Sequence, residues 1–220
     1  MDEATCRRCV QQLVKSGFGG AYLHARLGML TPYLSEAYLE AIQTSVTVMA
    51  EHGLVAHLYD EDRWPSGWAG GAVPLKDEKF RLKAVVRRFS SEPPPENSRL
   101  LTTGSGGESY YVETMALGHP KFSGACYTDL TSPAAIDCFL QEAYEPLALQ
   151  LGAELGNAQR AMWTDEPALT YLYTWPAGGL AWSEEIAPRF EAQTGCPLEN
   201  VVASLFEDTG ESPWVRLYYY

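Results

Sequence analysis

Three short apolar runs, each ending abruptly at polar or charged residues, restrict the fold of this 220-residue chain more than any other feature. They cover residues 21–23, 54–59 and 158–163. Continuous apolar runs of this length are typical of strands that are buried on both faces, as in parallel sheets. The residues that follow the runs begin with His24, with Asp60 and with the pair Thr164-Asp165.

Helical patterns separate these runs along the chain. Ser35 is a good N-cap for the second helix, and Pro133 suits the first turn of the third. Apolar residues recur at three- and four-residue spacing in segments 2–16, 35–52, 133–151, 183–194 and 198–207. The alternation of strands and helices predicts parallel βα units.

The stretch 74–125 breaks this alternation. It contains a basic alternating segment, a connection over 90–107 that is rich in Pro, Ser and Gly, and a strand-like run over 109–116. We interpret it as a small antiparallel excursion inserted in one βα loop. Its basic residues suit either an anion site or the solvated face of a hairpin.

Charge excludes several classes of function. Asp and Glu number 28 against 16 Lys and Arg, which gives a formal net charge of −12. Nucleic-acid and anionic-lipid partners are therefore not expected, since both need concentrated cationic side chains. No apolar stretch approaches the roughly 20 residues of a membrane span. The first ten residues do not resemble a secretory signal, so we expect a cytoplasmic protein, and Cys6 and Cys9 are expected to be packing thiols.

The charged strand ends predict where chemistry takes place. The carboxyl ends of parallel strands meet at one edge of a sheet, and buried charges cost several kcal/mol unless they are paired. Several converging acids are typical of glycoside hydrolysis, in which one carboxyl protonates the leaving oxygen and a second acts as nucleophile or base. Aromatic residues near these ends offer flat apolar faces for sugars: Tyr59, Trp64, Trp68, Trp163, Tyr171, Tyr173, Trp175 and Trp182.

Four segments carry a resemblance to a known group of enzymes. FGGAYLHAR, TPYLSEAYLEAI, HLYDEDRWPSGWAGG and WTDEPAL resemble the barrel core of bacterial glycoside hydrolases, most closely the α-L-rhamnosidase-like and β-galactosidase-like enzymes. The resemblance implies an α/β fold, a partial (β/α)8 TIM barrel, with residues 1–220 forming one domain and 74–125 inserted in it. A complete barrel takes about 250 residues, so the resemblance implies a fragment of about half a barrel.

The resemblance also implies roles for particular residues. The TDEP sequence is similar to the Asn-Glu-Pro sequence in which one large clan of glycosidases places its acid/base, so Glu166 is the implied general acid/base, and Asp165 replaces the Asn. The second catalytic carboxylate of that clan lies on a late strand, so the chain alone is expected to be inactive. Residues expected to bind the carbohydrate substrate are His24, Arg26, Asp60, Glu61, Asp62, Trp64 and Asp165.

Other interpretations of the same residues stay open. We expect no cofactor, although the carboxylates of residues 60–62 offer the oxygen ligands that Ca²⁺ prefers. Those acids can instead form structural pairs with Arg63 or Arg26. The chain can also be a carbohydrate-binding or degenerate hydrolase domain that does not turn over its ligand. A metal-assisted hydrolase using His24, Asp60 and Asp62 would lose its activity to a chelator. The oligomeric state is not predicted.

Overall fold

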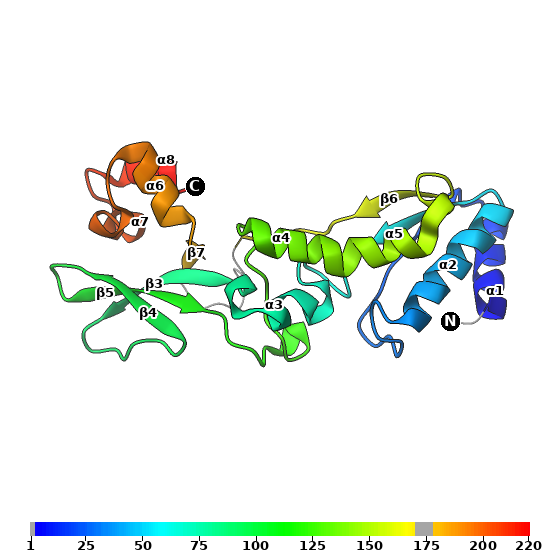
Figure 1. Cartoon of the computed structure of the whole chain (residues 1–220), viewed down its shortest axis with the longest axis horizontal. Helices are drawn as coiled ribbons and strands as arrows, with labels where there is room; N and C mark the ends of the chain where they lie inside the picture. The colour runs from blue at the N-terminus through cyan, green and yellow to red at the C-terminus, as the bar shows by residue number, and fades with distance from the viewer. Residues whose placement is uncertain (1–2, 170–177) are drawn as a thin grey trace. The chain divides into compact units, whose positions relative to one another are not determined.

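The computed structural model describes residues 3–169 and 178–220, and the chain forms two compact units. The first unit consists of Met1–Lys76 and Ile136–Ala168, and the second consists of Asp77–Ala135 and Leu169–Tyr220 (Figure 1). Within the described residues, no helix is both long enough and apolar enough to cross a bilayer.

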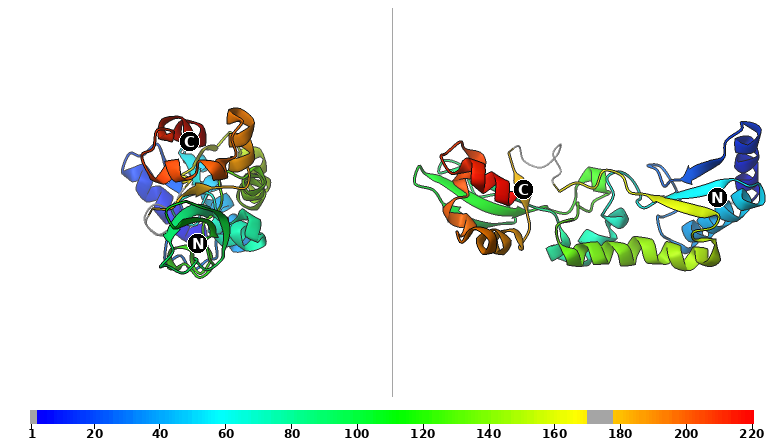
Figure 2. Two further views of the ribbon diagram at one scale, coloured as in Figure 1. Left: turned by 90° about the vertical axis from the view of Figure 1, so that its left-hand side faces the viewer. Right: turned by 90° about the horizontal axis from the view of Figure 1, so that it is seen from above.

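A three-stranded parallel sheet is the centre of the first unit (Figure 2). It contains β1 (Gly20–Leu23), β2 (Val55–Tyr59) and β6 (Gln159–Trp163), with β2 in the middle. Leu23 pairs with Leu58 in the parallel register, and Tyr59 pairs with Trp163. The three strands predicted from the apolar runs are therefore confirmed, and their carboxyl ends lie at the same edge.

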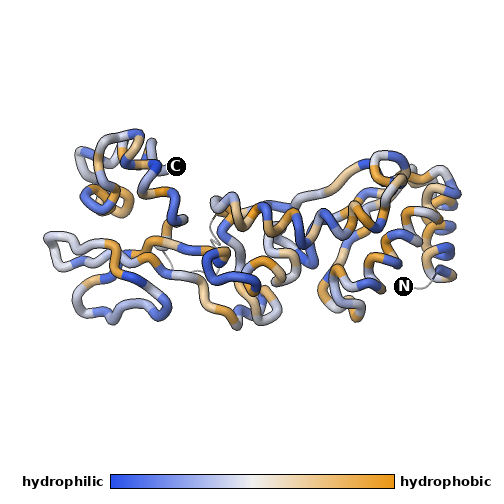
Figure 3. Tube along the Cα trace, viewed as in Figure 1, coloured by the Kyte–Doolittle hydropathy of each residue, from blue (hydrophilic) through white to orange (hydrophobic). Residues whose placement is uncertain are grey.

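The longer helices of the first unit are α1 (Glu3–Lys15), α2 (Glu36–Glu51) and α5 (Glu145–Leu151). Helix α4 (Pro133–Phe139) begins in the second unit and belongs to the first from Ile136 onward. A π-helical turn, Leu140–Tyr144, joins α4 to α5 without a break in the helix. Hydrophobic and hydrophilic positions alternate along this combined helix (Figure 3). The predicted cap of α2 is confirmed, because the Ser35 side chain accepts a hydrogen bond from the backbone N–H of Tyr38 at 3.3 Å.

Alternation along the strands gives the sheet two different faces. Leu23, Leu58 and Met162 belong to the hydrophobic core that the strands share with α2 and α5. Tyr22 and Trp163 are about half exposed, and their ring centroids lie 5.7 Å apart. The core of the first unit is thus on one side of the sheet, and an aromatic face is on the other.

The second unit contains a four-stranded sheet in which every pairing is antiparallel, in the order β4-β5-β3-β7. Its strands are β3 (Lys83–Phe89), β4 (Ser98–Thr103), β5 (Glu108–Thr114) and β7 (Leu180–Trp182). Val85, Tyr110 and Trp182 share a hydrophobic core with the helices that follow β7. Those helices are α6 (Ile186–Thr194), α7 (Ala203–Phe206) and α8 (Ser212–Tyr219).

Six further short helical segments complete the described fold. One is α-helical, α3 (Ala72–Lys76), and the other five are 3₁₀ turns. The 3₁₀ turns are η1 (Ala69–Gly71), η2 (Glu78–Phe80), η3 (Pro120–Phe122), η5 (Gly152–Glu154) and η6 (Leu198–Asn200).

The expectation of a partial TIM barrel is wrong. A barrel needs consecutive parallel strands with a helix after each, whereas among the strands of residues 3–169 and 178–220 only β1, β2 and β6 are parallel. The connection between β4 and β5 contains only Gly104 to Gly107, and a loop this short joins antiparallel neighbours. Strand β7, which follows the parallel strands along the chain, pairs antiparallel with β3. The part of the chain that the structure describes has an α/β fold with two separate sheets.

Candidate functional site

The carboxyl edge of the parallel sheet brings together the residues that follow its strands. The Tyr59 hydroxyl, at the end of β2, donates a hydrogen bond of 2.7 Å to Oδ2 of Asp165, which follows β6. The ring of His24, which follows β1, lies 3.5 Å from the Tyr59 ring between centroids. The predicted convergence of three strand ends is therefore present for His24, Tyr59 and Asp165. We call this edge the rim.

Glu166 presents an exposed carboxylate at the rim. Its Oε2 accepts a hydrogen bond from the indole Nε1 of Trp64 at 2.9 Å. The backbone φ of Glu166 is +43°, in the left-handed region where a residue with a side chain is strained by about 1–2 kcal/mol. Such strain persists only where neighbouring contacts hold the backbone in place.

Asp60 is fully buried at the end of β2. Its Oδ1 accepts a hydrogen bond from the Ser66 hydroxyl at 2.6 Å. Its Oδ2 accepts two more, each of 2.7 Å, from the hydroxyls of Tyr144 and Thr164. Because Asp60 has no exposed surface and all three donors belong to the protein, its carboxylate is not accessible to a sugar hydroxyl in this structure.

Glu61 is also fully buried, and backbone N–H groups surround its carboxylate. Oε2 accepts from residues 67, 68 and 69 at 2.7–3.1 Å, and Oε1 accepts from residue 62 at 2.8 Å and from residue 70 at 2.6 Å. The donors over 67–70 precede and begin a short helical segment, where free N–H groups favour an anion. Glu61 therefore folds the loop after β2 around its side chain.

Burial and hydrogen bonding act on the pKa of Glu61 in opposite directions. Burial raises the pKa of Glu61, and this pKa is about 8 if burial is the stronger effect. The backbone N–H groups lower the same pKa because they bind the ionised form. All five hydrogen-bond partners are donors, so a proton on either Glu61 oxygen would point at an N–H group instead of an acceptor. We infer from this geometry that Glu61 is ionised at neutral pH.

Asp62 and Arg26 do not join the other predicted residues in contacts at the rim. The Asp62 carboxylate forms an ion pair with Arg63, with a distance of 2.5 Å between Oδ2 and the guanidinium. Arg26 is exposed. The consecutive carboxylates of residues 60–62 thus have three separate sets of partners. Across residues 3–169 and 178–220, no group of three or more His, Cys, Asp or Glu side chains is arranged to hold a metal ion.

The His24 imidazole is half-buried beside the rim. Burial lowers its pKa, the nearby Arg26 charge lowers it further, and Asp165 opposes both effects. Its Nε2 is buried and makes no hydrogen bond among the described residues. His24 thus has a lowered pKa and a buried Nε2 that makes no hydrogen bond among the described residues.

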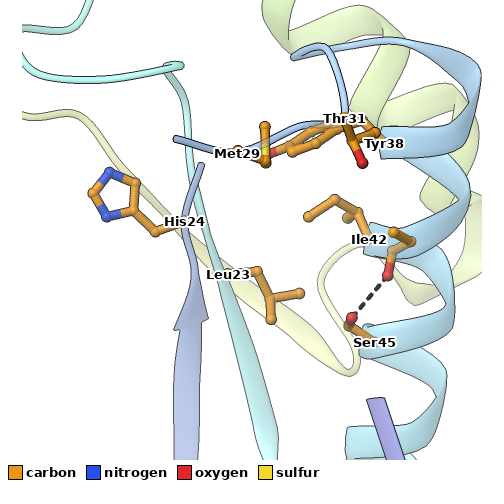
Figure 4. A pocket seen from close by; sticks show the side chains of 8 residues that line it. Leu23, His24, Met29, Thr31, Tyr38, Ile42 and Ser45 are labelled. Carbon is orange, nitrogen blue, oxygen red and sulfur yellow. Dashed lines mark hydrogen bonds between the residues drawn. The ribbon is translucent and has the colours of Figure 1, made fainter. Parts of the chain in front are cut away.

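A cavity of about 170 Å³ lies between β1 and α2. Leu23 and Ile42 point toward each other across it, and His24 also lines it, although its ring lies on the far side of β1 from Ile42 (Figure 4). Hydroxyls of Thr31, Tyr38 and Ser45 also line the cavity. This space therefore lies on the core side of the sheet and is not part of the rim.

Several aromatic residues of the sequence analysis differ in their placement. Trp64 and Tyr59 bond to carboxylates of the rim, and Trp163 is half exposed on the aromatic face. Trp68 is fully buried and donates to the backbone carbonyl of Arg63 at 3.3 Å, while Trp182 lies in the core of the second unit. Tyr171, Tyr173 and Trp175 lie outside the described residues.

Three residues that donate hydrogen bonds to the Asp60 carboxylate were not predicted as site residues: Ser66, Tyr144 and Thr164. The position of Ser66 within a turn-rich loop after β2 and that of Thr164 beside TDEP were available signals. Tyr144 lies 84 residues from Asp60 in the sequence, and its helical segment shows no pattern that distinguishes it from packing residues.

Comparisons of the chain with protein-family models, with curated proteins and with solved structures found no match.

Proposed function

We propose that the rim of the parallel sheet binds a glycoside and that Glu166 acts as its general acid/base. The observation that carries this proposal is the pair formed by the exposed Glu166 carboxylate and the Trp64 indole N–H, 2.9 Å apart. A proton donor needs access to the substrate, and Glu166 is the exposed acid among the predicted residues that follow β2 and β6.

The surroundings of Glu166 suit this chemistry. When Glu166 protonates a glycosidic oxygen, a carboxylate forms, and the Trp64 N–H is in place to bind it. Preformed donors that face a developing charge lower the barrier of such a step. Asp165, held by Tyr59 at 2.7 Å, is the adjacent carboxylate available to bind a sugar hydroxyl.

Aromatic rings beside these acids favour carbohydrate over other small polar substrates. Trp64 is half-buried, Trp163 is about half exposed, and Tyr22 and His57 lie next to each other with ring centroids 4.9 Å apart. Flat rings with polar edges can stack on the apolar face of a sugar while their hydrogen-bonding atoms stay available.

Carbohydrate binding without turnover is the second candidate. It is favoured by the state of the acids near Glu166, because Asp60 and Glu61 are fully buried and bonded to protein donors. Hydrolysis of a glycoside uses two carboxyl groups. In the described part of the rim, Asp165 is the second carboxylate that lies beside Glu166 and is not fully buried.

A panel of aryl glycosides, beginning with α-L-rhamnoside and β-galactoside, tests both candidates. Binding is measured by calorimetry and hydrolysis by release of the phenol, for the parent chain and for Trp64→Phe and Glu166→Gln. Glu40→Gln, at an exposed acid on α2, is the matched control.

The expectation of an inactive chain came from the barrel, which the fold does not contain. The proposal therefore predicts that at least one glycoside binds and is hydrolysed by the parent chain, that Trp64→Phe weakens its binding, and that turnover is lost in Glu166→Gln but kept in Glu40→Gln. Binding that needs Trp64, without turnover of any substrate, supports the second candidate and overturns the catalytic role. A panel in which no sugar binds contradicts both candidates.

A further inference from the structure

We propose that the buried Asp60 is a positioning residue, which fixes the turn that carries Glu166 by means of the Ser66 hydroxyl. This inference rests on the proposed function for its catalytic meaning, but its structural content stands on hydrogen bonds alone. It changes the role expected from the sequence, in which Asp60 binds substrate directly.

The connection runs through one serine. The Ser66 hydroxyl donates to Oδ1 of Asp60 at 2.6 Å and accepts from the backbone N–H of Asp165 at 2.8 Å. The backbone N–H of Ser66 donates in turn to the Asp165 carbonyl at 2.9 Å. Both backbone groups of Asp165 are therefore bound to Ser66, and the next residue is Glu166.

The other carboxylate oxygen of Asp60, Oδ2, binds the same turn at Thr164, the residue before Asp165. Oδ2 accepts from the Thr164 hydroxyl at 2.7 Å, so Asp60 binds the residue before Asp165 directly and Asp165 itself through Ser66. This explains how Glu166 is kept at a φ of +43°, because a strained backbone needs neighbours that fix the residues beside it.

The Tyr144 hydroxyl is the third donor to Asp60 and lies 2.7 Å from its Oδ2. Tyr144 is the last residue of the π-helical turn Leu140–Tyr144. Single π turns inside α-helices are uncommon and are frequent at functional sites. The irregular turn thus occurs where the helix supplies a hydroxyl to the buried carboxylate.

Glu61 positions Ser66 through the backbone of the same loop. Its carboxylate binds the N–H groups of Gly67, Trp68 and Ala69, which directly follow Ser66. Two buried carboxylates in sequence therefore have different tasks: Glu61 folds the loop after β2, and Asp60 uses the serine of that loop to fix the turn after β6.

The Trp64 indole N–H resonance reports on Glu166 without any substrate, so we use it for the test. The parent chain is compared with Ser66→Ala, with Asp60→Asn and with Glu166→Ala, which defines the resonance without the hydrogen bond. Ser45→Ala is the matched control, because it also removes a buried serine hydroxyl in the first unit, one that donates to the Ala41 carbonyl at 2.7 Å.

We expect Ser66→Ala and Asp60→Asn to move the Trp64 resonance at least half of the way to its position in Glu166→Ala, and Ser45→Ala to leave it at the parent position. Tyr144→Phe removes a single hydroxyl from Asp60 and is expected to produce a smaller shift in the same direction, which keeps the test valid if Ser66→Ala does not fold. A parent-like resonance in folded Ser66→Ala or Asp60→Asn overturns the proposal.

A glycoside assay separates this proposal from the proposed function. If Asp60 positions the acid, Ser66→Ala lowers kcat about tenfold and changes KM less than twofold, because the substrate contacts stay in place. A shifted Trp64 resonance in a chain that binds no sugar refutes the glycoside function and leaves the positioning role confirmed.

Discussion

Glu61→Gln is the substitution that examines the loop after β2 most directly. The change keeps the shape of the side chain and replaces one acceptor oxygen with an NH₂ group. Because all five partners of the carboxylate are backbone N–H donors, the NH₂ group must face some of them. We therefore expect a loss of stability with no change of side-chain volume.

The magnitude follows from the number of donors at each oxygen. If the amide oxygen takes the place of Oε2, which has three donors, the NH₂ group faces the N–H groups of Asp62 and Gly70. A hydrogen bond to a charged group contributes about 1.5–3 kcal/mol, so two lost bonds amount to about 3–6 kcal/mol. Removing a buried charge offsets part of this loss, and we expect a net destabilisation of about 3 kcal/mol.

Amide hydrogen exchange of Trp68 and Ala69 is the assay, because it reports on the loop itself. A loss of about 3 kcal/mol corresponds to exchange that is roughly 100 times faster at these amides. Glu40→Gln, at an exposed position on α2, is the control and should change exchange at Trp68 and Ala69 less than twofold.

The opposite outcome has a definite physical meaning. If Glu61→Gln is as stable as the parent at pH 7.5, or more stable, burial outweighs the hydrogen bonds and the pKa of Glu61 is raised to about 8. The inference that an ionised Glu61 organises this loop would then be refuted.

Three further predictions concern the first unit. Ser35→Ala should lower the free energy of unfolding by about 1 kcal/mol and Ser35→Gly by a few tenths, by urea denaturation, because the α2 cap is lost; equal losses would contradict the cap. Tyr33→Phe should leave the melting temperature unchanged or raise it, since the Tyr33 hydroxyl is buried without a hydrogen-bond partner among the described residues. Because burial lowers the folded-state pKa of His24 below 6.5, the unfolded chain binds its proton first, and stability falls as the pH drops through 6.5. His24→Gln should reduce that fall, and an unchanged pH dependence, judged against the exposed control His52→Gln, would refute it.

The parts of the fold that depend on local chemistry were predictable. A Ser at position 35 caps a helix through its own side chain and the next few N–H groups. The apolar runs before Asp60 and Asp165 predicted the strands β2 and β6, but the expected burial on both faces is wrong, because Trp163 of β6 is half exposed on the aromatic face. Parallel pairing then followed from the helices between the strands.

The order of strands and helices along the chain did not by itself indicate a barrel. Parallel βα order is common to barrels and to small open sheets, and the difference depends on where the remaining strands pair. Here β3 pairs with β5 and with β7, and the partner β7 comes from a part of the chain more than 90 residues away. Such long-range pairing leaves no local sign in either strand.

The candidate site shows the same limit. Two of its members, the half-buried Trp64 and the exposed Glu166, could be chosen from the sequence, because packing alone explains charged and aromatic residues poorly where they directly follow strands. The roles of Asp60 and Glu61 could not, because they depend on hydroxyls and N–H groups that the loop and the π turn bring to them. Adjacent acids look equivalent in a sequence until the backbone around them is known.

The effect of the leaving group on Glu166→Gln tests the central claim, proton donation from the rim, most directly. For an alkyl glycoside, whose departing oxygen needs a proton, hydrolysis should fall by about 10²–10⁴-fold, the usual contribution of a positioned acid. For a dinitrophenyl glycoside of the same sugar, which departs without protonation, the fall should be much smaller. Equal losses for the two substrates, or parent-like hydrolysis of the alkyl glycoside, would contradict the account.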